Sequence, residues 1–295
     1  MKPAVIAMPG NELLADDLAA RLSLERIAAT VRRFPDGESH VRVEAPAEGR
    51  DALIVCTLDR PDDKLVPLLL LAAAVRETGA HSVGLVAPYL AYMRQDRRFQ
   101  SGETVSAQHV AAWISHSFDW LVTVDPHLHR ITDLSQVYSI RSSVVHAADS
   151  VAEWVRSNVR NPLLIGPDEE SAQWVSEVAK DADAPFVVLT KTRRGDREVE
   201  VSVPEVDRWR SHTPVLVDDI VSTARTMIEA AGHLRRAGLA APVCVAVHAV
   251  FAQTAFEDLR AAGAGDIVSC DTIRHLSNRI SLAPGIATIV RAQLP

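Results

Sequence analysis

The sequence predicts an α/β protein with two tandem units, each a mainly parallel sheet covered by helices. Short apolar runs typical of strands alternate with longer stretches typical of helices, and the second half of the chain repeats this rhythm. Alternation of this kind favours parallel strands with helices on both faces of the sheet. We place the boundary near the middle of the chain, which gives domains 1–146 and 147–295.

In the first half the elements follow one another closely. We expect strands at Ala52–Cys56, Ser82–Ala87 and Trp120–Val124, and helices at Leu65–Thr78 and Val105–Phe118. Each strand is a short apolar run, whereas the helices are longer and mix apolar with polar residues.

The second half repeats the pattern and adds a charged arm. We expect one helix from Ala147 and another at Ser171–Lys180. We expect strands at Leu163–Ile165, Phe186–Leu189, Val215–Val217 and Val243–His248. Residues Lys191–Val203 are charged, with valine at alternate positions near their end, and this alternation predicts a projecting hairpin.

Composition excludes several classes of protein. The formal net charge of −7 argues against general nucleic-acid binding, which needs a broad basic face. The apolar run Leu65–Val75 is too short to cross a bilayer, so we expect no membrane span. Cys56, Cys244 and Cys270 lie far apart in apolar segments, which indicates buried thiols in a reducing compartment. We therefore expect a cytoplasmic protein.

The most informative segment is Val215–Thr226. A short apolar strand ends in two adjacent carboxylates, Asp218 and Asp219, and a helix with apolar residues at helical spacing begins at Met227. The hydroxylated residues between them and the free N–H groups of a helix start suit a phosphate, while paired acids suit the vicinal hydroxyls of a sugar. The alternative is a capped turn with solvated acids.

Five other polar segments have two interpretations each. They are Arg33–Glu38, Ala87–Arg98, Asp125–His129, Gly166–Ser171 and Lys191–Arg197. The first contains Asp-Gly, which is typical of a hairpin turn. The second holds three arginines and a glutamine, which suit a polyphosphate or form a solvated loop. The third suits either a metal or structural histidines. The carboxylates of Gly166–Ser171 are typical of caps at a helix start. The cations of Lys191–Arg197 are either solvated or part of a mobile segment that closes over phosphates.

Taken in order, these segments resemble the ribose-phosphate pyrophosphokinase family over nearly the whole chain. The resemblance runs from Gly10-Asn11 to Val247-His248 and Phe251, and residues 218–226, which we call the ribose loop, resemble the ribose-binding signature of the type I phosphoribosyltransferase fold. It therefore implies two tandem domains of that fold, with ATP-binding elements in the first and the ribose 5-phosphate loop in the second.

The resemblance also implies site residues. ATP contacts fall at Phe34, Asp36, Glu38, Arg94 and Gln95, and ribose 5-phosphate contacts fall at Asp218, Asp219, Ser222, Thr223, Ala224, Arg225 and Thr226. Magnesium is implied near His127 and Asp168. Lys191 and Arg193 are implied as catalytic residues that neutralise charge in the transition state.

The reaction that the resemblance implies is transfer of the diphosphoryl group of ATP to the 1-hydroxyl of ribose 5-phosphate, giving 5-phosphoribosyl 1-pyrophosphate and AMP. The family works with Mg²⁺ as homo-oligomers, dimers or hexamers, with sites shared between subunits. No residue stands out as a general base. Two alternatives stay open: a phosphoribosyltransferase that consumes the product, and a non-catalytic regulatory homologue. Glu169, Glu170 and Arg225 favour the latter because they replace glycine-type positions of the family.

Overall fold

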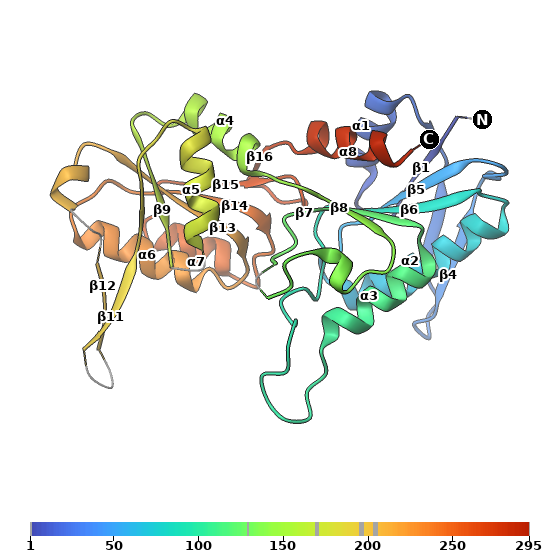
Figure 1. Cartoon of the computed structure of the whole chain (residues 1–295), viewed down its shortest axis with the longest axis horizontal. Helices are drawn as coiled ribbons and strands as arrows, with labels where there is room; N and C mark the ends of the chain where they lie inside the picture. The colour runs from blue at the N-terminus through green and yellow to red at the C-terminus, as the bar shows by residue number, and fades with distance from the viewer. Residues whose placement is uncertain (1, 129, 169–170, 195–197, 203–205, 295) are drawn as a thin grey trace. The chain divides into compact units, whose positions relative to one another are not determined.

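The chain forms two compact units (Figure 1). The computed structural model describes residues 2–128, 130–168, 171–194, 198–202 and 206–294. Unit 1 comprises residues 1–146 and 283–295, and unit 2 comprises residues 147–282. Each unit contains a six-stranded sheet whose paired strands are parallel. The predicted fold class is therefore confirmed.

The sheet of unit 1 has the strand order β2-β1-β5-β6-β7-β8. Its strands are β1 (Ala4–Ala7), β2 (Glu25–Arg26), β5 (Asp51–Val55), β6 (Ser82–Ala87), β7 (Trp120–Val124) and β8 (Arg141–Val145). Adjacent residues of β5, such as Leu53 and Ile54, are both fully buried. Because side chains alternate between faces, both faces of this sheet are covered.

Helices α2 (Pro61–Glu77) and α3 (Ser106–Ser117) share one core cluster with the sheet. Helices α1 (Glu12–Leu22) and α8 (Ala283–Gln293) pack against each other, and α8 also contacts β7 and β8. Helix α2 begins four residues before the expected Leu65, because Pro61 occupies the first turn and acidic residues follow it there.

The position of α8 differs from the sequence-based division, which placed residues 283–295 in the second domain. Its buried residues Ala283, Ile286, Ala287 and Val290 follow helical spacing and form an apolar stripe. That stripe packs on unit 1. Order along the chain does not reveal which sheet a terminal helix covers.

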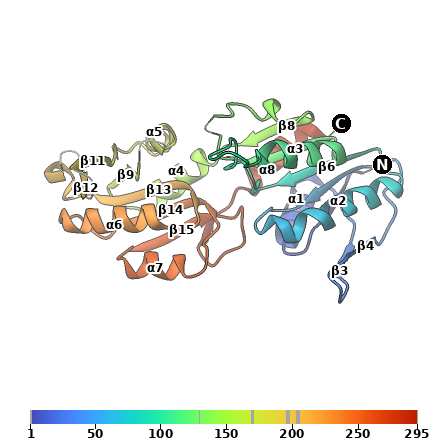
Figure 2. The same ribbon diagram turned by 90° about the horizontal axis from the view of Figure 1, so that it is seen from below.

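The sheet of unit 2 has the order β10-β9-β13-β14-β15-β16. Its strands are β9 (Pro162–Gly166), β10 (Phe186–Val188), β13 (Thr213–Val221), β14 (Val243–Ala249), β15 (Asp266–Cys270) and β16 (Asn278–Ile280). Figure 2 shows α6 (Arg225–Arg236) and α7 (Ala255–Ala261) on one face of this sheet, with α4 (Ala148–Asn158) and α5 (Ala172–Asp181) on the other.

Two antiparallel hairpins stand outside the sheets. Unit 1 carries β3 (Ala29–Arg33) and β4 (Ser39–Val43), and unit 2 carries β11 (Thr190–Arg194) and β12 (Glu198–Ser202). The second is the arm that the alternating valines predicted. Its turn, residues 195–197, lies outside the described part of the chain.

No helix within the described residues is long and apolar enough to span a membrane. Cys56, Cys244 and Cys270 are buried, as expected, and form no disulfide with one another. Burial raises the pKa of both the Cys56 and the Cys244 thiol to about 12, so these two groups are protonated and unreactive near neutral pH.

Candidate active site

The paired acids lie within β13 rather than after it. The sequence predicted a strand at Val215–Val217, but β13 continues to Val221 because Ile220 and Val221 still pair with β14. Each acid binds the next backbone N–H: Asp218 Oδ1 accepts from Asp219 N at 3.0 Å, and Asp219 Oδ1 accepts from Ile220 N at 2.7 Å. Both carboxylates are half-buried at the carboxyl end of the sheet.

The residues after β13 form a short loop that leads into α6. Ala224, the N-cap residue, has a left-handed backbone with φ of +55°, and α6 begins at Arg225, two residues before the expected Met227. Alanine has no side-chain oxygen to cap the helix, so the first N–H groups of α6 stay available to an anion. Thr223 and Arg225 are exposed beside them, and Ser222 is half-buried.

Asp168 lies one strand away, just after β9, which is the neighbour of β13. Its Oδ1 accepts from Ser171 N at 3.2 Å, and Ser171 Oγ donates to the Asp168 carbonyl at 2.7 Å. Asp168 thus binds Ser171, the residue that precedes α5, which agrees with the helix-start alternative that the sequence left open. Glu169 and Glu170 lie outside the described residues.

Asp168 also influences the paired acids electrostatically. Removal from water raises the pKa of Asp218 well above its ordinary value, and the negative charges of Asp219 and Asp168 raise it further. A cation or hydroxyl hydrogen-bond donors would relieve this repulsion. The carboxyl ends of β9 and β13 therefore form a site that favours a polyhydroxylated or cationic ligand.

In unit 1 the residues after β6 form a long loop. Arg94 and Gln95 are exposed in it. The Asp96 side chain is only 6% exposed and accepts from Arg130 Nη1 at 3.1 Å. Tyr92 donates to Asp62, and this hydrogen bond raises the pKa of the Tyr92 phenol to about 12. These contacts anchor the loop and leave Arg94 and Gln95 facing solvent.

The segment after β7 has a strained backbone. Asp125 and His127 have positive φ angles of 28° and 56°. Asp125 Oδ1 lies 3.0 Å from Nδ1 of His146, which follows β8. His146 could not be identified from the sequence, since nothing in its spacing marks it as a partner of Asp125. Among the described residues no group of three or more His, Cys, Asp or Glu side chains is arranged to hold a metal, and His129 is not one of those residues.

Phe34, Asp36 and Glu38 lie at the tip of the β3–β4 hairpin. Glu38 N donates to Asp36 Oδ1 at 3.2 Å, and Arg32 lies 4.6 Å from the centre of the Phe34 ring. The Asp-Gly segment is thus a hairpin turn. Glu38 lines a cavity of about 510 Å³ against α2. The hairpin and the loop that carries Arg94 and Gln95 both contact the start of α2, since Arg33 Nη2 donates to Asp63 Oδ1 at 3.3 Å and Tyr92 donates to Asp62.

Lys191 and Arg193 lie on β11, where they pair with Val201 and Val199 of β12. The structure therefore places both cations on a hairpin that projects from unit 2 (Figure 1).

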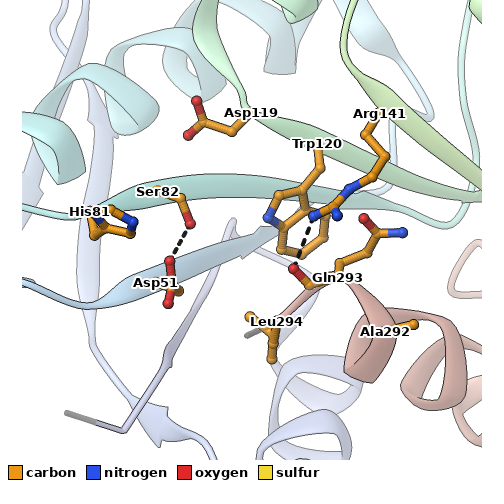
Figure 3. A pocket seen from close by; sticks show the side chains of 9 residues that line it. All are labelled: Asp51, His81, Ser82, Asp119, Trp120, Arg141, Ala292, Gln293 and Leu294. Carbon is orange, nitrogen blue, oxygen red and sulfur yellow. Dashed lines mark hydrogen bonds between the residues drawn. The ribbon is translucent and has the colours of Figure 1, made fainter.

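Another cavity, of about 540 Å³, lies at the amino-terminal ends of the unit 1 strands (Figure 3). There Ser82 Oγ donates to Asp51 Oδ1 at 2.5 Å, and Arg141 donates to the Gln293 carbonyl at 3.0 Å. The motifs singled out from the sequence contribute no lining residue to it. It is therefore separate from the sites at the carboxyl ends of the strands.

Acids and an open helix start at the carboxyl ends of parallel strands define an α/β protein of the phosphoribosyltransferase class. Comparison with known proteins agrees: residues 133–278 match the phosphoribosyl transferase domain, and residues 4–117 match the N-terminal domain of ribose phosphate pyrophosphokinase. The chain belongs to the ribose-phosphate pyrophosphokinase family.

Similar proteins cover nearly the whole chain. The ribose-phosphate pyrophosphokinase of Methanopyrus kandleri is 35% identical over 97% of this chain and 98% of its own. That of Methanothermobacter thermautotrophicus is 31% identical, over 97% and 99%. The crystal structure of phosphoribosylpyrophosphate synthetase from Mycobacterium smegmatis superimposes with a TM-score of 0.87, at 24% identity and 99% coverage of both chains, which supports the fold.

Proposed function

We propose that this chain performs its family's reaction with ribose 5-phosphate bound in unit 2 and ATP bound by elements of unit 1. The 1-hydroxyl of ribose 5-phosphate attacks the β-phosphorus of ATP, the bond from that phosphorus to the α–β bridging oxygen breaks, and AMP leaves, while the hydroxyl proton is released to solvent. The observation that carries the assignment is the pair Asp218 and Asp219, directly followed by the uncapped start of α6.

The ribose loop offers complementary groups to the two ends of the sugar phosphate. Asp218 and Asp219 accept hydrogen bonds from the vicinal ribose hydroxyls, and their mutual repulsion falls as those bonds form. The 5-phosphate accepts hydrogen bonds from backbone N–H groups and side-chain hydroxyls of residues 222–226. These residues are Ser222, Thr223, Ala224, Arg225 and Thr226. Arg225 adds a cation at a helix start that already favours anions.

The ATP elements support a homo-oligomer. Phe34, Asp36 and Glu38 lie at the tip of the β3–β4 hairpin, whose turn extends beyond its paired strands and is open to a second copy of the chain. We propose that the hairpin of one copy completes the ATP site of another, in a dimer or hexamer.

We propose Mg²⁺ as the cofactor, because the crowded carboxylates of Asp168, Asp218 and Asp219 favour a bound cation. Asp168 and Asp218 are close enough to raise the pKa of Asp218, and hard oxygen ligands of this kind suit Mg²⁺. We assign Mg²⁺-binding roles to Asp168 in unit 2 and to His127 in unit 1, each within its own unit, and bound Mg²⁺ would neutralise phosphate oxygens. Lys191 and Arg193 supply further positive charge from the arm. Buried cysteines that form no disulfide support a cytoplasmic location.

The reaction is tested by product analysis. With ATP, ribose 5-phosphate and Mg²⁺ we expect equal amounts of AMP and 5-phosphoribosyl 1-pyrophosphate, and no AMP when ribose 5-phosphate is omitted. Chromatography of the nucleotides and a phosphorus NMR spectrum of the sugar product measure both. Steady release of ADP would show ordinary kinase chemistry and would contradict the proposal, and absence of turnover would favour a regulatory homologue.

A further inference from the structure

A buried histidine lies beside the ribose loop. His248 is fully buried in β14 and pairs with Ile220 of β13, the residue that follows Asp219. A buried imidazole needs polar partners. One partner is the hydroxyl of Thr272, which is only 2% exposed.

The direction of this hydrogen bond follows from a second one. The Thr272 hydroxyl donates to the Val247 carbonyl at 2.8 Å, and the same oxygen lies 2.9 Å from His248 Nδ1. A hydroxyl has one hydrogen, so His248 Nδ1 must donate to Thr272 Oγ1. Thr272 thus fixes the tautomer and the orientation of the imidazole.

The pair stands where the ladder between β14 and β15 stops. The last paired residues are Ala246 and Ser269, so the Val247 carbonyl lies just beyond the ladder. A buried carbonyl without a strand partner needs another donor. Thr272, in the loop after β15, is that donor, and it ties the end of β14 to this loop.

The chain beyond His248 supports the ribose loop directly. Phe251 N donates to the Val221 carbonyl and Ala252 N to the Ser222 carbonyl, both at 2.9 Å. These bonds hold the backbone just before Ala224, whose left-handed conformation costs free energy and persists only where neighbours impose it. The end of β14 is therefore a template for the loop.

We propose that His248 and Thr272 are a positioning pair: by locking the end of β14, they hold the ribose loop in the conformation that binds the sugar phosphate. The inference rests on the proposed ribose 5-phosphate site and adds two residues that act on it through the backbone. Neither the motif spacing nor the resemblance assigns them a role.

The test removes the hydroxyl while keeping the shape. Thr272→Val loses both hydrogen bonds, and Thr272→Ser keeps them. The matched control is Ser269→Ala, since Ser269 is also fully buried and its hydroxyl also makes two hydrogen bonds, with Ser277 and Asn278. Those bonds lead away from β13. His248→Asn keeps an N–H donor near the position of Nδ1. It provides a second test of the pair if another variant does not fold.

We measure ribose 5-phosphate binding by calorimetry without ATP, the KM of both substrates, and thermal midpoints. Thr272→Val should weaken ribose 5-phosphate binding about tenfold with the KM for ATP changed by less than about twofold, because two hydrogen bonds that order the loop are lost. Thr272→Ser and His248→Asn should retain most of the affinity. Ser269→Ala should lower the midpoint without weakening binding.

The inference is overturned if Thr272→Val and Ser269→Ala lose similar stability and both bind ribose 5-phosphate as the unmodified protein does. If Thr272→Val does not fold, Thr272→Ala, which also removes both hydrogen bonds, takes its place, and ribose 5-phosphate binding by Thr272→Ala as tight as that by Ser269→Ala overturns the inference. Failure of the unmodified protein to bind ribose 5-phosphate would instead refute the proposed function.

Discussion

At the scale of single residues, the pKa of the Asp218 carboxyl distinguishes this site from a strand end that is open to solvent. This pKa is raised above the ordinary 3.8, first by removal from water and then by the charges of Asp219 and Asp168. Between pH 3.8 and that raised value the folded protein binds more protons than the unfolded chain, so its stability falls as pH rises through this window. Asp218 therefore lowers the stability of the fold at neutral pH. A carboxyl with a pKa raised in this way is typical of a functional site.

We therefore expect Asp218→Asn to be more stable than the unmodified protein at neutral pH and yet less active. The gain should vanish as pH falls toward 4, because Asp218 is then protonated anyway. Loss of a charge-assisted hydrogen bond should lower kcat/KM for ribose 5-phosphate roughly 10- to 150-fold. Thermal unfolding from pH 4 to 8 and steady-state kinetics measure the two effects. Reduced stability at pH 7 together with unchanged kinetics would contradict the assignment.

Ala224 gives a second prediction at this scale. A residue with a Cβ at φ of +55° costs roughly 1 kcal/mol relative to glycine, so Ala224→Gly should raise the free energy of unfolding by up to about that amount. Ala237→Gly is the matched control. Ala237 ends the same helix with a right-handed φ of −73°, and glycine there should destabilise. Urea denaturation measures both variants. A loss of stability in Ala224→Gly equal to that of the control would contradict the strain argument.

At the scale of elements, the β11–β12 hairpin carries the two cations that we propose neutralise a bound phosphate. Lys191 and Arg193 occupy alternate positions of β11, and the hairpin projects from unit 2 (Figure 1). An arm of this kind can fold over substrates and exclude water. Cations that reach the phosphoryl group only after closure stabilise the transition state more than the bound substrates.

Lys191→Ala should therefore lower kcat at least about 100-fold with little change in either KM, and Arg193→Ala should have a milder effect of the same kind. Arg194, a cation on the same strand to which no role is assigned, is the control, and Arg194→Ala should be nearly neutral. Initial rates over a range of both substrates separate kcat from KM. A raised KM with unchanged kcat would place Lys191 in ground-state binding and remove its catalytic role.

For the whole molecule, the proposed homo-oligomer predicts ATP sites shared between copies, with the β3–β4 hairpin of one copy beside the Arg94 loop of another. Asp36→Ala and Arg94→Ala should each be nearly inactive alone. After the two variants are mixed, dissociated and reassembled, about a quarter of the sites should combine one intact hairpin with one intact loop. Activity assays before and after mixing, with sedimentation to confirm assembly, measure the recovery. No recovery in mixed oligomers would mean that each ATP site comes from one chain.

Much of the fold could be predicted because it depends on local patterns. The bounds of β6 and β7 matched the expected strands, since short apolar runs between turns report buried parallel strands directly. The Asp-Gly turn and the alternating valines predicted the two hairpins. By contrast, β13 was predicted too short, because acids rarely occupy a strand unless the neighbouring strand continues to pair with them.

The sequence by itself determined the class of fold, the family, and the residue types available at each strand end, because these follow from periodicity and from motifs of fixed spacing. Only the tertiary structure decided that α8 covers unit 1, that Asp168 binds Ser171 before α5 while repelling Asp218, and that Asp125 pairs with His146. It alone revealed the His248–Thr272 pair under the ribose loop. These relations join residues distant in the chain, and distances between such residues are set by the packing of whole elements rather than by local sequence.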